Sequence, residues 1–101
     1  MLHDAFIKKK FQGRCSKHVF ELGITVLKNH WRQGIGKEMM LMLIEESRKL
    51  GAKKIILDFN ESNIAALKLY EKLGFVEEGR LRNQIMVNGQ YLDLIIMALS
   101  L

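Results

Sequence analysis

Two segments of the chain carry residue types and spacings that could do chemistry. The first, residues 31–37, reads Trp-Arg-Gln-Gly-Ile-Gly-Lys and lies between a strand-like run and a helix-like run. Its glycines let the backbone approach an anion closely, and a helix that begins there adds the positive end of its dipole. An isolated Gly-x-Gly turn more often only packs, and this one is neither a Walker loop nor a complete dinucleotide fingerprint. By itself the segment favours an anion site without establishing one.

The second segment, residues 63–75, begins with Asn63 and places a phenol, Tyr70, two helical turns later. A phenol can serve as a proton donor in general acid catalysis. A single tyrosine on an amphipathic helix is more often a half-buried packing residue. The wider pattern around Tyr70 has to decide between these two interpretations.

Hydrophobic periodicity predicts the elements that must position these segments. We expect helices from 35 to about 50 and from about 62 to 73, and strands at 5–7, 19–27, 54–59, 75–87 and 90–99. Asn88-Gly89 is a strong two-residue hairpin signal, and Gly51 and Gly74 are typical residues after a helix end. The order (β)-β-α-β-α-β-β predicts an α/β (α+β) fold with a mixed sheet and two flanking helices.

The buried face of the first helix is expected at Met39, Met42, Leu43 and Leu50, which fall at helical spacing. The apolar run 94–99 is typical of an interior strand that is covered on both faces.

Composition bounds the class of protein. A chain of 101 residues with 27% charged side chains and a net charge of +5 predicts one small globular domain that favours a polyanionic ligand, either a phosphorylated cofactor or a nucleic acid. Cys15 is alone and the longest apolar run, 39–44, is too short to cross a bilayer, so we expect a cytoplasmic protein without membrane contact. No spacing indicates a metal site or a nucleophile, and four residues are therefore interpreted as structural or surface residues: His3, Cys15, His18 and His30.

Taken together and in this order, the two segments resemble the acyl-CoA-binding half of the GCN5-related N-acetyltransferase (GNAT) superfamily. The family's second signature, Asn-x-x-Ala-x-x-x-Tyr-x-Lys-x-Gly-Phe, is complete here as Asn63, Ala66, Tyr70, Lys72, Gly74 and Phe75. Its Gln/Arg-x-x-Gly-x-Gly/Ala loop matches at Gly34 and Gly36 and departs at the first position, which is Trp31. The resemblance implies a GNAT-like acyl-CoA N-acyltransferase fold.

The resemblance also implies a role for each candidate residue. The pyrophosphate of acetyl-CoA, the acetyl donor, would lie against the loop residues Arg32, Gln33, Gly34, Ile35, Gly36 and Lys37. The pantetheine arm would pair with the backbone of Ile24 and Val26 and contact Asn63, and no metal is implied. Tyr70 would protonate the departing CoA thiolate. Glu21 is a candidate base, although a strand glutamate is more often a solvated or ion-paired surface residue.

A full domain of this family begins with a first strand, two helices and two more strands. The resemblance therefore predicts a single partial domain over 1–101, in which residues 1–17 are an N-terminal remnant and 18–101 form the acetyl-CoA-binding core. The strand at 19–27, interior in the family, would then present an open apolar edge that recruits a second copy into a homodimer. The apolar run 39–44 points the same way, because a surface helix normally buries only one stripe.

The leading interpretation is an N-acetyltransferase, or a fragment of one, that transfers the acetyl group of acetyl-CoA to a primary amine by direct attack. The alternative is a catalytically inactive CoA-binding or assembly module. A nucleic-acid-binding domain has only the charge in its favour and lacks an aromatic platform or a recognition helix. The sequence does not name the acceptor, which is either a small molecule or a protein.

Overall fold

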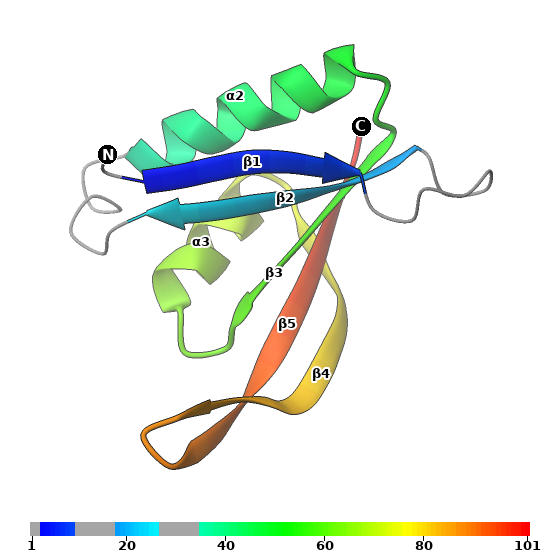
Figure 1. The fold of residues 1–101 in the computed structure, drawn as a ribbon. Coiled ribbons are helices and arrows are strands. Elements are labelled where there is room, and N and C mark those ends of the chain that lie inside the picture. Colours follow the sequence, from blue (N-terminus) through cyan, green and yellow to red (C-terminus); the bar gives the residue numbers. More distant parts are fainter. Residues whose placement is uncertain (1–2, 10–17, 27–34) are drawn as a thin grey trace. The chain divides into compact units, whose positions relative to one another are not determined.

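The computed structural model describes residues 3–9, 18–26 and 35–101 (Figure 1). The described residues form five strands and two helices: β1 (His3–Lys9), β2 (Val19–Val26), α2 (Ile35–Lys49), β3 (Lys54–Asn60), α3 (Ile64–Lys72), β4 (Val76–Val87) and β5 (Gln90–Ser100). The chain divides into two compact units, Met1–Ile56 with Ser100–Leu101 and Leu57–Leu99, so that β3 begins in the first unit and ends in the second. The predicted mixture of helices and a mixed sheet is confirmed.

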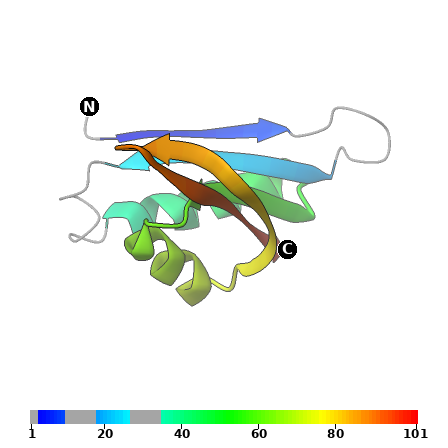
Figure 2. The ribbon, with the colours of Figure 1, turned by 90° about the horizontal axis from the view of Figure 1, so that it is seen from below.

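In the first unit, β2 is the central strand. β1 pairs antiparallel with residues 20–26 of β2, whereas β3 pairs in parallel with residues 19–21 only. Two parallel strands need a crossover connection, and α2 supplies it, lying along the β1–β2 pair in both views (Figures 1 and 2). The expectation that the outer edge of β2, which faces away from β3, is open is wrong. β1 is longer than the strand expected at 5–7, and it pairs along that edge.

Helix α2 buries a different face from the one that the sequence predicted. Two of the four expected core positions, Met42 and Leu50, are 71% and 55% exposed, and the other two are only half-buried. The buried stripe is Met40, Ile44 and Ser47, at the i, i+4, i+7 spacing of one helix face. The prediction failed because an uninterrupted apolar run carries no helical period and because a serine was not counted as a core residue.

In the second unit, the strand order is β3-β5-β4. The β4–β5 hairpin is long and strongly curved (Figure 2). It turns at Asn88 and Gly89, whose φ angles of 50° and 77° are both positive, as a type I′ two-residue loop requires. The hairpin prediction is therefore confirmed.

The two strands of the hairpin are buried to different degrees. β4 is exposed along most of its length, while Ile95, Met97 and Ala98 of β5 are buried. The predicted interior strand is confirmed by the place of β5 between β3 and β4. The faces of β5 are not completely covered, since Leu94 and Ile96 are half-buried.

The predicted helix ends are close to those observed. Gly51 and Gly74 follow α2 and α3 with φ angles of 99° and 98°, which glycine adopts without strain. Helix α3 begins at Ile64 and not near Ser62, because Asn63 has a non-helical backbone and serves as its N-cap.

Candidate active site

The first turn of α2 is the described part of the expected pyrophosphate loop. Three of the loop candidates lie outside the described residues: Arg32, Gln33 and Gly34. Ile35 is the first residue of the helix, and buried Gly36 and exposed Lys37 follow it. The first four N–H groups of a helix have no acceptor within the helix. The N–H groups of Ile35, Gly36 and Lys37 therefore lie at a helix N-terminus, where an anion is favoured.

Strand β2 carries the candidates Glu21, Ile24 and Val26. Ile24 and Val26 are in register with residues of β1, and the pairing of β2 with β3 ends at Glu21. Among the described residues, the backbone edge of β2 beyond Glu21 that faces away from β1 thus has no strand partner. An unpaired strand edge can bind an extended ligand through backbone hydrogen bonds, as when a peptide adds a strand to a sheet.

Glu21 lies opposite Lys8 of β1 and Ile56 of β3, and its side chain is half-buried. This position on a central strand suits a structural role as well as an acid–base role.

Asn63 is the N-cap of α3. Its Oδ1 accepts a hydrogen bond from the Ala66 backbone N–H at 3.0 Å, and its backbone N–H donates to the Asn60 carbonyl at 2.8 Å. The cap uses the carboxamide oxygen, so the carboxamide NH₂ of this exposed residue can donate to a ligand. A structural and a binding role are therefore compatible at Asn63.

Tyr70 is buried, with 3% of its surface exposed, although it carries a polar hydroxyl. Its ring packs between two phenylalanines at tilted angles, with centroid distances of 5.4 Å to Phe59 and 5.7 Å to Phe75. Burial, and secondarily the negative charge of Asp58, raises the pKa of Tyr70 to about 12. The phenol therefore keeps its proton at neutral pH, which is the form that a general acid needs.

The rest of the signature forms the frame around Tyr70. Ala66, one turn before Tyr70, is 1% exposed, and Phe75 is 3% exposed and donates its backbone N–H to the Tyr70 carbonyl at 2.9 Å. Gly74 closes the helix with its positive φ and its N–H bond to the Glu71 carbonyl at 3.1 Å. Lys72, by contrast, is an exposed residue at the helix end. Most signature positions thus fix the helix that carries the phenol.

Sequence reasoning passed over Asp58. It is the exposed residue between buried Leu57 and Phe59 on β3, and its charge acts on the Tyr70 phenol. The available signal was the alternation of β3, in which a single acidic residue interrupts an otherwise apolar run.

In the part of the chain that the structure describes, no group of three or more His, Cys, Asp or Glu side chains is arranged to hold a metal ion. No helix there is long and apolar enough to cross a membrane.

A family model of the Acetyltransferase (GNAT) family matches residues 5–75, which is most of the chain. The chain is also 40% identical, over 78 residues, to the ribosomal protein bS18-alanine N-acetyltransferase of Escherichia coli (strain K12). That alignment covers 77% of this chain and 53% of the relative, so the chain spans about half the length of this relative. The chain belongs to the GNAT acetyltransferase family.

Solved structures share the fold. The ribosomal-protein-alanine N-acetyltransferase of Brucella melitensis matches with a TM-score of 0.86 and 29% identity, over 99% of this chain and 62% of that one. The protein yncA from Salmonella typhimurium, solved with its cofactor acetyl-CoA, matches with a TM-score of 0.87 over 98% of this chain and 57% of that one. At 23% identity the second likeness shows the fold alone. The predicted GNAT-like fold is confirmed.

Proposed function

We propose that this chain is the acetyl-CoA-binding part of an N-acetyltransferase, which moves the acetyl group of acetyl-CoA to a primary amine by direct attack. The observation that carries the proposal is the complete signature from Asn63 to Phe75 in a member of the family, with Tyr70 held as a protonated phenol. The Escherichia coli relative is named for the alanine of a ribosomal protein. A peptide that begins with alanine is therefore the first acceptor to test.

The proposed cofactor contacts follow the backbone. The pyrophosphate lies against the amides of residues 32–37, and the N-terminal N–H groups of α2 support the second half of this span. The pantetheine arm pairs with the backbone of Ile24 and Val26, on the edge of β2 that has no strand partner among the described residues. The carboxamide NH₂ of Asn63 donates to the same arm.

The proposed chemistry uses Tyr70 and Glu21. The amine nitrogen forms a bond to the acetyl carbonyl carbon, the carbon–sulfur bond breaks, and Tyr70 gives its proton to the departing thiolate. The nitrogen loses one proton as the amide forms, and this proton restores the phenol of Tyr70. Glu21 takes a proton from the acceptor ammonium, so that the nitrogen can attack as the free amine. Burial, and secondarily the charge of Asp58, disfavours the tyrosinate, so the acid stays in its protonated form.

The first experiment is a calorimetric titration of the chain with acetyl-CoA. Lys37→Gln removes a positive charge from the first turn of α2, and Lys53→Gln removes one from an exposed position beyond the other end of that helix. We expect Lys37→Gln to weaken binding about three- to tenfold and Lys53→Gln to leave it nearly unchanged. Equal losses in the two variants would show that only the net charge matters. Single-stranded DNA at two salt concentrations is the matched competitor, and DNA binding in place of acetyl-CoA binding would overturn the proposal.

The second experiment measures transfer to the alanine peptide. Tyr70→Phe should lower turnover about 10- to 1000-fold and leave the affinity for acetyl-CoA nearly intact, because the hydroxyl acts when the thiolate leaves and not when the cofactor docks. An unchanged rate, with chemistry shown to limit turnover, would leave Tyr70 a packing residue. Tight binding of acetyl-CoA without transfer to any amine would favour the alternative, an inactive CoA-binding module.

A further inference from the structure

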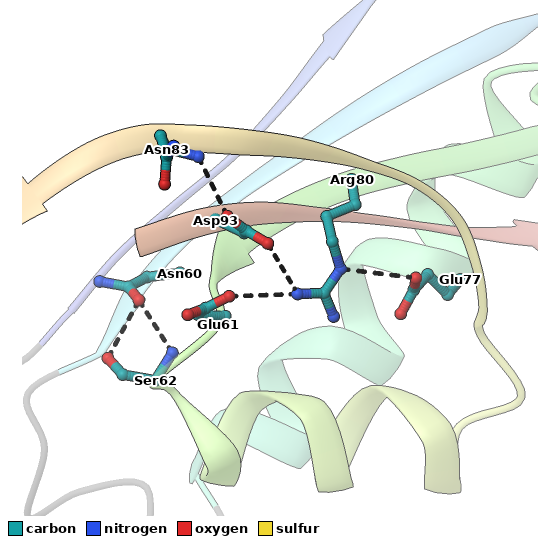
Figure 3. Close-up of polar contacts among 7 residues, drawn as sticks. All are labelled: Asn60, Glu61, Ser62, Glu77, Arg80, Asn83 and Asp93. Carbon is teal, nitrogen blue, oxygen red and sulfur yellow. Dashed lines mark hydrogen bonds and ion pairs between the residues drawn. The ribbon is translucent and has the colours of Figure 1, made fainter. Parts of the chain in front are cut away.

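One arginine ties the turn after β3 to both strands of the hairpin. The Arg80 guanidinium on β4 donates from one terminal nitrogen to Glu61 Oε2 at 3.1 Å and to Asp93 Oδ2 at 3.0 Å (Figure 3). Its Nε lies 3.9 Å from Glu77 Oε2 on its own strand. Glu61 belongs to the turn between β3 and α3, and Asp93 belongs to β5.

Asp93 is the centre of this cluster. Its carbonyl accepts from the Glu61 N–H at 3.0 Å, and its Oδ1 accepts from the Asn83 N–H at 3.0 Å. Asn83 has a positive φ of 53° and lies where the β4–β5 register shifts. The Asn83 N–H, and after it Arg80, lowers the pKa of Asp93, whose side chain is only 15% exposed. Asp93 therefore supports the irregular part of the hairpin and the turn after β3 together.

The turn itself leads directly to Asn63. Asn60 Oδ1 accepts from the backbone N–H of Ser62 at 2.9 Å and from its hydroxyl at 3.0 Å (Figure 3). The Asn60 carbonyl accepts from the Asn63 N–H, and Asn63 then caps α3. Glu61 is the residue of this turn that is held from outside, by Arg80 and by the Asp93 backbone.

We propose that Arg80 is a positioning residue: by holding Glu61 beside Asp93, it fixes the β3–α3 turn and so places Asn63 and the helix that carries Tyr70. The catalytic consequence rests on the proposed function, whereas the ordering of the turn does not. Ion pairs as exposed as that between Arg80 and Glu61, with side chains 37% and 33% exposed, add little to stability. Their effect here is geometric, because one planar guanidinium holds two carboxylates in fixed directions.

Hydrogen exchange without any ligand tests the ordering of the turn. The backbone amides of Ser62 and Ala66, which donate to the side chains of Asn60 and Asn63, are the reporters. Arg80→Gln should raise their exchange rates about tenfold and leave the buried strand amides of β3 unchanged. Arg80→Lys keeps the positive charge but lacks the planar guanidinium with its fixed N–H donors. It should therefore restore only part of the protection from exchange. Arg82→Gln is the control, since the charge of Arg82 also acts on Asp93, but Arg82 forms no salt bridge with Glu61 or Asp93. Unchanged exchange in Arg80→Gln would overturn the proposal.

Calorimetry with acetyl-CoA tests the consequence for the site. Arg80→Gln should weaken binding about three- to tenfold relative to Arg82→Gln, which loses the same charge. Where transfer is measured, kcat should fall more than KM rises. Equal affinities in the two variants, together with faster exchange at Ser62 and Ala66, would overturn the positioning role. A parent chain that does not bind acetyl-CoA would overturn both the proposed function and the positioning role. The exchange rates would still test whether Arg80 orders the turn.

Discussion

The phenol of Tyr70 links the packing of the second unit to the chemistry proposed for it. Its pKa of about 12 arises mainly from burial and secondarily from Asp58, so Asp58→Asn should lower it while leaving it above the ordinary value of 10.0. The chain has two tyrosines, and Tyr91→Phe therefore isolates Tyr70 in an ultraviolet absorbance titration. An equal pKa with and without the carboxylate would mean that Asp58 does not act on the phenol.

The same raised pKa predicts how stability depends on alkaline pH. The unfolded chain releases this proton near pH 10, and the folded chain holds it until about pH 12. The stabilisation is therefore fully present below pH 10 and is lost as the pH rises to 12, by about 2 to 3 kcal/mol for a shift of this size. Urea unfolding of the parent and of Tyr70→Phe between pH 9 and pH 12 measures it. A parallel decline in both proteins would assign the loss to other groups.

Ser47 is a polar residue in the core of α2. It is 0% exposed, and in the part of the chain that the structure describes its Oγ is the one fully buried side-chain polar atom without a hydrogen-bond partner. Ser47→Ala removes the unpaired hydroxyl at little cost in volume, and should raise the free energy of unfolding by about 1 kcal/mol. Ser47→Val adds bulk at the same place and should lower it. Chemical denaturation measures both, and a loss of stability in Ser47→Ala would reveal a hydrogen bond to this hydroxyl.

At the scale of elements, helix α3 shows why a short signature could be interpreted from sequence. Asn63 caps the helix, Ala66 and Tyr70 form its buried side, and Gly74 ends it. These are local requirements of a helix, and each restricts the residue type, so the pattern predicted the helix and the place of Tyr70 on it. For α2 the sequence offers no such position-specific residues. Its apolar run from 39 to 44 contains no polar residue that would show which face of the helix is buried.

Asn63 offers a test that separates capping from binding. Asn63→Ser keeps an oxygen that can cap α3 but loses the NH₂ donors, whereas Asn63→Ala loses both. Asn63→Ala should destabilise the chain by about 1 kcal/mol, and Asn63→Ser by much less. Both variants should bind acetyl-CoA more weakly, as measured by calorimetry. Parent-like affinity in Asn63→Ser would mean that Asn63 serves only as a cap.

At the scale of the whole molecule, the order of elements could be predicted from sequence, and the pairing of the first strand could not. Periodicity and turn residues indicated each element between Val19 and Ser100 to within a few residues. The segment before Val19 has a weak pattern, and its pairing with β2 connects residues that are distant in sequence. The Arg80 cluster was missed for the same reason, since Glu61, Arg80 and Asp93 come together only when the hairpin folds beside the turn after β3.

The pairing of β1 with β2 changes the argument for a homodimer, which we still propose. The outer edge of β2 is paired with β1, so it no longer argues for a dimer. The edge of β4 is poorly suited to pairing with a second copy, because its register with β5 shifts twice and it carries charged side chains. The reason that remains is the outer face of α2, where Leu41 and Met42 are 48% and 71% exposed.

Sedimentation at micromolar concentration should therefore show a dimer for the parent chain and a monomer for Met42→Lys. Met86→Lys is the matched control, since Met86 on the hairpin is 64% exposed. A dimer that persists in Met42→Lys and dissociates in Met86→Lys would place the interface on the hairpin, and a parent chain that is monomeric at every concentration would contradict the dimer itself.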